Sequence, residues 1–246
     1  MLSYLLEKGP NLFGVAETKL LLFEKGDKSN DSYLSHMQIN QIELDAIIFD
    51  LGGVILNIDY QLTINAFEKL GFKNFNAQYS KMQQSGLFDN LEKGLITEKE
   101  FVSEIKKEIE SASSDDIINA WNALILDFPP IRLELLQKLK KEVKLFLLSN
   151  TNEIHLQAFN NILKEFGQDS LVPHFDKLYL SHEINARKPD AEAFEIILKE
   201  NDLSVDRVLF IDDSPQHIEA AQKLGMHTIH IDGDKTIEDL FAAFLT

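Results

Sequence analysis

Residues 44–54 place a carboxylate at the end of an apolar segment that has the composition of a buried strand. Residues 44–49 read LDAIIF, and Asp50 is followed at once by the turn-forming sequence LGGV. Isoleucine and phenylalanine in such a run are typical of an interior strand of a parallel sheet, and these sheets bind ligands beyond the carboxyl ends of their strands. Aspartate beside glycine is also a common turn cap, so this segment alone leaves Asp50 open between the two roles.

Four further apolar runs have the length of strands, and helical patterns separate them. We predict strands at residues 44–50, 143–148, 177–180, 207–211 and 227–231. Leucines recur at helical spacing over residues 131–141, and Pro189 and Pro215 stand where the first residue of a helix would be. This alternation predicts right-handed βαβ units, and therefore an α/β fold with a Rossmann-like, doubly wound parallel sheet.

The interval between the first two predicted strands has no strand pattern and is too long for a simple crossover. Its apolar residues recur at helical spacing, Thr97 and Glu100 have the form of a capping box, and Ser114 precedes another helical pattern. We therefore predict a core of residues 43–58 and 130–246. A small α-helical cap domain, residues 59–129, is inserted over the carboxyl edge of its sheet.

Residues 1–42 fit this alternation poorly. Residues 25–32 are polar and turn-forming, and the apolar clusters near Leu5 and at residues 20–23 show no clear period. We expect an N-terminal extension that is disordered or not native. Met37 lies a few residues before the first strong strand, so one hypothesis is that the native chain starts there.

Three more predicted strands run into polar residues. Ser149 and Asn150 follow the second strand, Lys188 lies beyond the third, and Asp212 with Asp213 follows the fourth. The carboxyl ends of parallel strands meet at one edge of a sheet. Two buried aspartates need a divalent cation or a basic partner. Each residue has an ordinary alternative as a helix cap or a solvated side chain, but the four sites in this order favour a functional centre.

These motifs resemble those of the haloacid dehalogenase-like (HAD) hydrolase superfamily with a small helical cap. The resemblance extends from Asp45 to the C-terminus, and it rests on the sequences DLGGV at 50–54, SNT at 149–151, KP at 188–189 and DD at 212–213. The longer sequences FDLGGV, LSNTN, YLS and RKP are most similar to the bacterial α-D-glucose-1-phosphate phosphatase group. The resemblance implies a phosphatase acting on a small phosphorylated metabolite, with a sugar phosphate favoured.

The resemblance also implies a role for each motif. Asp50 would be the nucleophile that forms an aspartyl-phosphate, and Lys188 would bind the phosphate and, in the resting state, Asp50. Mg²⁺ would be held by Asp50, the backbone carbonyl of Gly52 and Asp213, with Asp212 acting through water or behind the ligands.

The phosphate oxygens would be bound by the Ser149 hydroxyl and by backbone N–H groups near Leu51, Gly52 and Asn150. Arg187, the neighbour of the lysine, is expected to face solvent or an acidic partner.

Gly52 departs from the pattern of most phosphatases of this superfamily, which have a second aspartate there as general acid and base. The backbone carbonyl that would bind the metal is kept, but the proton donor is not. General acid catalysis is worth about 10² to 10⁴-fold, so its loss must be tolerated, replaced or taken as a sign of inactivity. The loss disfavours a phosphomutase and favours a leaving group that is already acidic, such as an anomeric hydroxyl.

In the family, the loop of the cap that faces the phosphate site corresponds to the polar turn at residues 88–94. Phe88 and Glu92 are therefore candidates for contacts with a sugar ring and its hydroxyls, with packing and helix capping as the ordinary alternatives. His155, His182 and His217 fall near strand ends and are expected to be local capping or surface residues.

Composition narrows the class of partner. The chain has no cysteine and a formal net charge of −16, and its basic residues are scattered. Thiolate metal sites are excluded, oxygen ligands and hard cations such as Mg²⁺ are favoured, and nucleic acid is an unfavourable partner. No apolar stretch reaches the roughly 20 residues of a membrane span, and the start lacks the pattern of a secretory signal. We expect a cytoplasmic protein with a small phosphorylated substrate, as a monomer or a dimer.

Two alternatives stay open. A 2-haloacid dehalogenase also uses an aspartate nucleophile but needs no metal, and the pair Asp212 and Asp213 argues against it. A catalytically weak regulatory or binding protein could keep the fold and metal after losing turnover through Gly52.

The hypothesis of a start at Met37 predicts that the purified native protein yields no peptides from residues 1–36. Mass spectrometry of its N-terminus measures this, and recovery of any upstream peptide would contradict it.

Overall fold

A five-stranded parallel sheet forms the centre of the computed structural model, which describes residues 3–7, 19–25, 37–39, 42–73, 75, 86–233 and 235–245. Its strands follow the order β7-β6-β5-β8-β9, and every neighbouring pair is parallel. The strands are β5 (Ala46–Phe49), β6 (Lys144–Ser149), β7 (Lys177–Leu180), β8 (Val208–Asp212) and β9 (His227–His230). The predicted doubly wound α/β fold is confirmed, and each strand lies close to its expected place.

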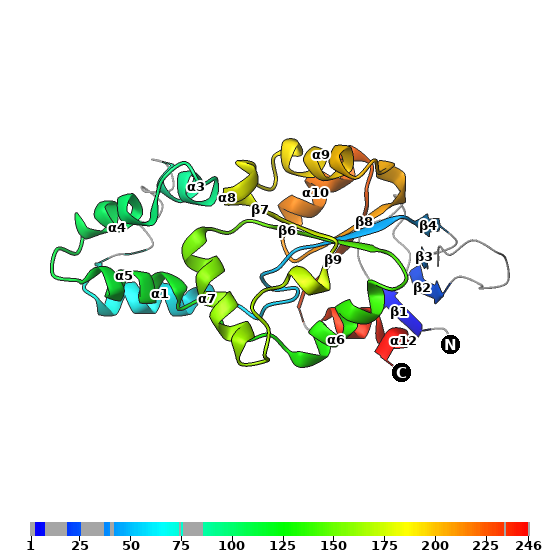
Figure 1. Cartoon of the computed structure of the whole chain (residues 1–246), viewed down its shortest axis with the longest axis horizontal. Coiled ribbons are helices and arrows are strands. Elements are labelled where there is room, and N and C mark those ends of the chain that lie inside the picture. The colour runs from blue at the N-terminus through cyan, green and yellow to red at the C-terminus, as the bar shows by residue number, and fades with distance from the viewer. Residues whose placement is uncertain are drawn as a thin grey trace.

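Helices cover both faces of this sheet (Figure 1). One face carries α9 (Ala191–Glu200) and α10 (Pro215–Leu224). The other carries α6 (Pro130–Leu139), α7 (Glu153–Lys164), α11 (Ile237–Leu240) and α12 (Ala242–Leu245). The chain is completed by α8 (Ser181–Ile184) and the short 3₁₀ helices η1 (Val172–His174) and η2 (Val205–Arg207).

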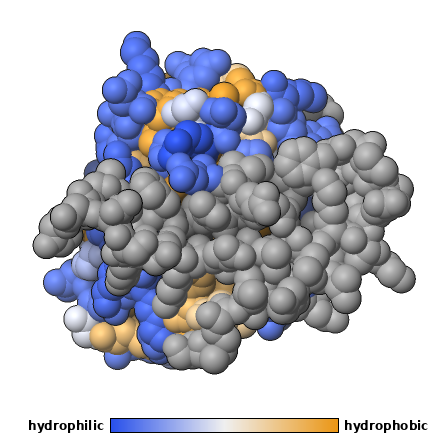
Figure 2. Space-filling model, turned by 90° about the vertical axis from the view of Figure 1, so that its right-hand side faces the viewer, coloured by the Kyte–Doolittle hydropathy of each residue, from blue (hydrophilic) through white to orange (hydrophobic). Residues whose placement is uncertain are grey.

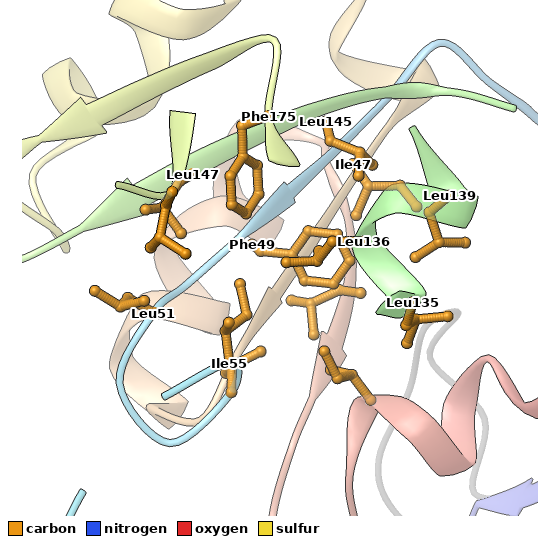
Figure 3. Packing of buried hydrophobic residues seen from close by; sticks show 14 of the residues in the cluster. Ile47, Phe49, Leu51, Ile55, Leu135, Leu136, Leu139, Leu145, Leu147 and Phe175 are labelled. Atoms are coloured by element: carbon orange, nitrogen blue, oxygen red, sulfur yellow. The ribbon is translucent and has the colours of Figure 1, made fainter. Parts of the chain in front are cut away.

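The side chains of β5 alternate between the two layers. Ile47 and Phe49 pack with Leu136 of α6 on one face (Figure 3), whereas Ile48 packs with Phe194 of α9 on the other. A strand that is apolar on both faces is fixed in register by both layers. Asp50 at its end is therefore held in place by the core.

One expectation about a helix start is wrong. Helices α6 and α10 begin with a proline, but α9 begins at Ala191, so Pro189 is not its first residue. The Asn150 side chain bonds both the N–H and the carbonyl of Lys188, which holds this segment as a turn. The helical pattern that follows Ser114 is present as α5, and the side chain that caps its N-terminus is that of Ser113.

Four described helices form a separate unit at the left of Figure 1: α1 (Tyr60–Lys69), α3 (Leu87–Glu92), α4 (Glu98–Lys106) and α5 (Ser114–Asn122). The unit has its own hydrophobic core, which includes Phe67, Phe101 and Trp121. The predicted capping box of Thr97 and Glu100 is present at the start of α4.

Two antiparallel linkers join this helical unit to the sheet. The N–H of Asn57 donates to the carbonyl of Asp127, that of Leu126 to Asn57, and that of Asp59 to Leu124. Arg132 bonds the Asn57 side chain at 3.0 Å and Glu238 of α11 at 2.9 Å. The expected cap boundaries fall beside these linkers, and the division into domains stays a prediction.

The first predicted strand is divided at Asp45. Its first residue, Leu44, belongs to β4 (Ile42–Leu44), and the chain bends at Asp45, whose carboxylate bonds Arg207 at 2.7 Å. With β1 (Ser3–Glu7), β2 (Lys19–Lys25) and β3 (Met37–Ile39), β4 makes a second, antiparallel sheet. Strands thus occur where the sequence showed no clear period. Whether residues 1–36 are native stays a prediction.

The surface at this end of the molecule is mainly hydrophilic where the structure describes it, with hydrophobic side chains between the polar ones (Figure 2). Single apolar side chains on a surface are ordinary in globular proteins. Of the helices in the described residues, none combines the length and the apolar character that crossing a membrane requires.

Candidate active site

Lys188 lies buried between two carboxylates at the carboxyl ends of the central strands. Its Nζ is 2.7 Å from Asp50 at the end of β5 and 2.6 Å from Asp212 at the end of β8. The expected contact between Lys188 and Asp50 is confirmed. The side chains of Lys188 and Asp212 are 0 % exposed, so both charges depend on each other for solvation.

The charges in this cluster do not balance. Burial alone would lower the pKa of Lys188, but Asp50 and Asp212 outweigh it and raise the pKa, so the lysine is cationic. Burial raises the pKa of Asp50 to about 7, against the attraction of Lys188 and with repulsion from Asp212 and Asp213. Burial, and then the Asp212 charge, also raises the pKa of Asp213. One ammonium facing three carboxylates leaves a surplus of negative charge that a cation would relieve.

The three carboxylates are close enough to share one metal ion. Ligand oxygens of Asp50, Asp212 and Asp213 all lie within 4.8 Å of one another. Gly53 makes this approach possible, because its φ is +72° and a Cβ there would collide with the Asp213 carboxylate. An all-oxygen set of this kind suits a hard divalent cation.

Asp212 is held on several sides. His217 Nδ1 lies 3.0 and 3.1 Å from its two oxygens, and the N–H of Ser214 donates to it at 2.7 Å. Burial would raise the pKa of Asp212, but Lys188 and His217 outweigh it and hold the pKa at about 2. His217 is therefore a buried partner of a carboxylate, and the capping or surface role expected for it is wrong. Pro215 begins α10 and therefore places His217 in its first turn. This helix start is the sequence signal that could have predicted the contact with Asp212.

The second strand end supplies Ser149 and Asn150. Ser149 is the last residue of β6, next to β5, and is buried. The Asn150 side chain donates to the Lys188 carbonyl at 2.8 Å and accepts from the Lys188 N–H at 2.9 Å. Asn150 thus fixes the backbone that carries the lysine, a contact that spacing alone did not suggest. The expected phosphate contacts of both residues stay predictions.

Gly52 lies in the turn after Asp50, and the space beside it is occupied. A Cβ at this position would stand 2.9 Å from Ile58 Cδ1. The side chain of Ile58, from the first linker, therefore fills the place where a residue 52 side chain would start. No sequence pattern indicates this contact, because the two residues meet only through the fold of the turn.

The helical unit meets the sheet above this site through charged residues next to Lys188. Arg187 forms ion pairs with Asp89 and, at 3.0 Å, with Glu92, both of α3. Lys93 pairs with Asp190 at 3.2 Å. The expectation of an acidic partner for Arg187 is confirmed. Burial raises the pKa of Glu92, while Arg187 and Lys188 act to lower it, so Glu92 lies within reach of the lysine's field.

Phe88 is 4 % exposed and stacks on Trp121 at a ring-centre distance of 5.3 Å. This agrees with the alternative that Phe88 is a packing residue. Trp121 in turn stacks on His155 at 5.1 Å, and His155 Nδ1 bonds Asn122 at 2.8 Å. Burial lowers the pKa of His155 to about 3, so it is neutral. The His182 side chain is also buried. The capping or surface role expected for these two histidines is wrong, and substrate contacts of Phe88 and Glu92 stay predictions.

Several known proteins are similar to this chain. A D-ribitol-5-phosphate phosphatase from Bacteroides thetaiotaomicron is 30 % identical over 185 residues, which cover 74 % of this chain and 89 % of the relative. A phosphorylated carbohydrates phosphatase from Thermotoga maritima is 21 % identical, over 76 % of this chain and 84 % of the relative.

A solved HAD-family enzyme from Bacteroides thetaiotaomicron, in complex with magnesium and inorganic phosphate, has a TM-score of 0.75 and 33 % identity. The match covers 80 % of this chain and 98 % of that one. The family model for haloacid dehalogenase-like hydrolases matches residues 44–225. The chain therefore belongs to the haloacid dehalogenase-like hydrolase family.

Proposed function

We propose that this protein is a Mg²⁺-dependent phosphatase of a small phosphorylated metabolite, with a sugar or polyol phosphate as substrate. The observation that carries the proposal is the buried set of Asp50, Lys188, Asp212 and Asp213 beneath the helical unit. The phosphatases among the relatives, and a related enzyme with bound magnesium and phosphate, support it. Membership of the α-D-glucose-1-phosphate phosphatase subgroup stays a prediction, and one of the relatives is instead a D-ribitol-5-phosphate phosphatase.

In the proposed reaction, an oxygen of Asp50 attacks the phosphorus of the substrate. The bond between phosphorus and the leaving oxygen breaks as the aspartyl-phosphate forms, and water then attacks phosphorus and releases Asp50 and phosphate. Lys188 stabilises the equatorial phosphate oxygens, together with the Ser149 hydroxyl and the backbone N–H groups of residues 51, 52 and 150. Because Lys188 is already within 2.7 Å of Asp50, its charge is in place before substrate binds.

The carboxylates fit a magnesium ion, since their surplus negative charge and oxygen-only donors match a hard cation. Asp50, the Gly52 carbonyl and Asp213 would hold it. Asp212, which is occupied by Lys188 and His217, would act through water or by orienting these groups. When bound, the ion supplies positive charge between the anionic nucleophile and the anionic phosphate.

The leaving group departs without an acid at position 52. Ile58 makes this side of the turn apolar, so the proton has to come from water, from substrate or from the helical unit. The missing acid slows hydrolysis least for an ester of an acidic alcohol, because the anion of such an alcohol can leave without being protonated.

Asp50→Asn should lower turnover of p-nitrophenyl phosphate by at least about a thousandfold, because the amide cannot attack phosphorus. Asp45→Asn is the matched control, since Asp45 pairs with Arg207 at the other end of β5. Release of nitrophenol is measured with Mg²⁺ and with EDTA, and EDTA should abolish the wild-type rate.

Wild-type activity in Asp50→Asn would refute the nucleophile. Halide release that persists in EDTA would support a dehalogenase. No turnover by the wild type on a broad panel of phosphate esters would support a binding protein instead.

Gly53→Ala should weaken Mg²⁺ binding by at least about tenfold, because the new Cβ displaces the Asp213 carboxylate. Gly71→Ala is the control: its φ of +95° imposes similar backbone strain, but its Cβ would meet nothing within 4 Å. Calorimetric titration with Mg²⁺ measures both. Equal affinity in the two variants would show that Asp213 does not hold the ion.

Gly52→Asp combined with Ile58→Ala should speed hydrolysis of alkyl phosphates on the order of tenfold more than that of aryl phosphates. The second change clears the atom that stands 2.9 Å from the new Cβ. Ile58→Ala alone is the control, and steady-state kcat/KM for the two ester types is the measurement. An equal effect on both esters would argue against a missing acid.

A further inference from the structure

Several buried polar atoms at the junction of the helical unit and the sheet have no hydrogen-bond partner among the described residues. They are Trp121 Nε1, Asn152 Nδ2 and both ring nitrogens of His182. Trp121 and Asn152 are 6 % and 1 % exposed, and the His182 side chain is 8 % exposed. Buried polar groups are nearly always bonded, and leaving one unpaired is destabilising. Three residues with such atoms along one junction are therefore unusual.

A chain of contacts between the helical unit and the sheet runs through these three residues or their neighbours. Phe88 of α3 stacks on Trp121 of α5, which stacks on His155 of α7. The N–H of His155 donates to the Asn152 side chain at 3.0 Å, which leaves only the amide nitrogen of Asn152 unpaired.

The chain of contacts continues through α8. The Ser181 hydroxyl and the backbone of Thr151 exchange two hydrogen bonds of 2.9 Å, which joins the neighbours of His182 and Asn152. The carbonyl of His182 lies so close to Gly94, just beyond α3, that a Cβ at 94 would collide with it. The pairs α3 with α8 and α5 with α7 lie side by side in Figure 1.

The chain of contacts borders the phosphate site. Asn152 is two residues beyond Asn150, whose side chain holds the Lys188 backbone. Glu92, one helical turn beyond Phe88, faces Arg187 at 3.0 Å without hydrogen-bond alignment, and Glu153 stands 3.7 Å from His182 Nε2. The other buried unpartnered atoms belong to Asn160, His174 and Arg207, outside the chain of contacts.

The chemistry of these atoms selects one class of ligand. Trp121 and Asn152 offer only donors at the unpaired atoms, the ring nitrogens of His182 add further hydrogen-bonding positions, and Glu92 adds an acceptor. Hydroxyl groups both donate and accept, so a polyol can pair with all of them. An apolar leaving group would leave them unpaired, and a second phosphate would meet the Glu92 carboxylate.

We propose that Trp121, Asn152 and His182 form the subsite for a hydroxyl-rich leaving group, and that the helical unit closes fully only when such hydroxyls supply the missing partners. The proposal rests on the phosphatase function proposed above. Without a polyol, closure buries unpaired polar atoms. With one, those atoms gain hydrogen bonds, so closure is tied to the class of substrate.

Trp121→Phe keeps the aromatic stack but removes Nε1–H, and Asn152→Ser keeps a helix-capping oxygen but removes Nδ2. Each should lower the ratio of kcat/KM for D-ribitol 5-phosphate to that for p-nitrophenyl phosphate by about tenfold. Asn160→Ser is the matched control, because it alters an unpaired asparagine of α7 outside the chain of contacts and should leave the ratio unchanged. Thermal unfolding and inhibition by inorganic phosphate check that fold and phosphate site are kept.

An unchanged ratio in both variants, with the wild type active on both esters, would overturn the subsite and leave the phosphatase intact. The subsite would also be overturned if the wild type hydrolysed p-nitrophenyl phosphate but no polyol or sugar phosphate. A wild type that hydrolysed neither ester class would overturn the proposed function itself.

Discussion

The ion pairs of Lys188 with Asp50 and Asp212 are the interactions on which the rest of the site depends. A fully buried ammonium is unfavourable unless carboxylates surround it, and these two come from neighbouring central strands. Removing Lys188 would leave two buried carboxylates without their ammonium partner. Three features hold this arrangement in place: the order of the strands, the turn at Gly53, and the hydrogen bonds of the Asn150 side chain to the Lys188 backbone.

The segment that presents Lys188 also receives the helical unit. Arg187 and Asp190 form ion pairs with residues of α3 and the turn beyond it, and Asn185 donates to the carbonyl of Lys93 at 2.8 Å. One short stretch of chain therefore contacts both Asp50 and the helices above it. Partly exposed pairs such as these contribute little to stability.

Local pattern was sufficient to predict the five strands, the inserted helices and the residues at the strand ends, because buried parallel strands are continuously apolar and their ends are not. It failed where distant segments decide. Pro189 has the local pattern of a helix start, but the Asn150 side chain holds the preceding backbone in another conformation. His217 has the local pattern of a surface residue, but α10 directs its side chain toward Asp212. The contact between Ile58 and Gly52 has no signal in the sequence, because it depends only on how the turn and the linker pack together.

The paired linkers described above have a mechanical consequence. Because residues 57–59 and 124–127 are hydrogen-bonded to each other, the two linkers form one short antiparallel ribbon, and one linker cannot bend freely while these bonds hold. Arg132 anchors this ribbon, since it bonds both Asn57 and Glu238 near the end of the chain. The C-terminal helices, remote from Asp50 and Lys188, thus help to anchor the ribbon that carries the helical unit.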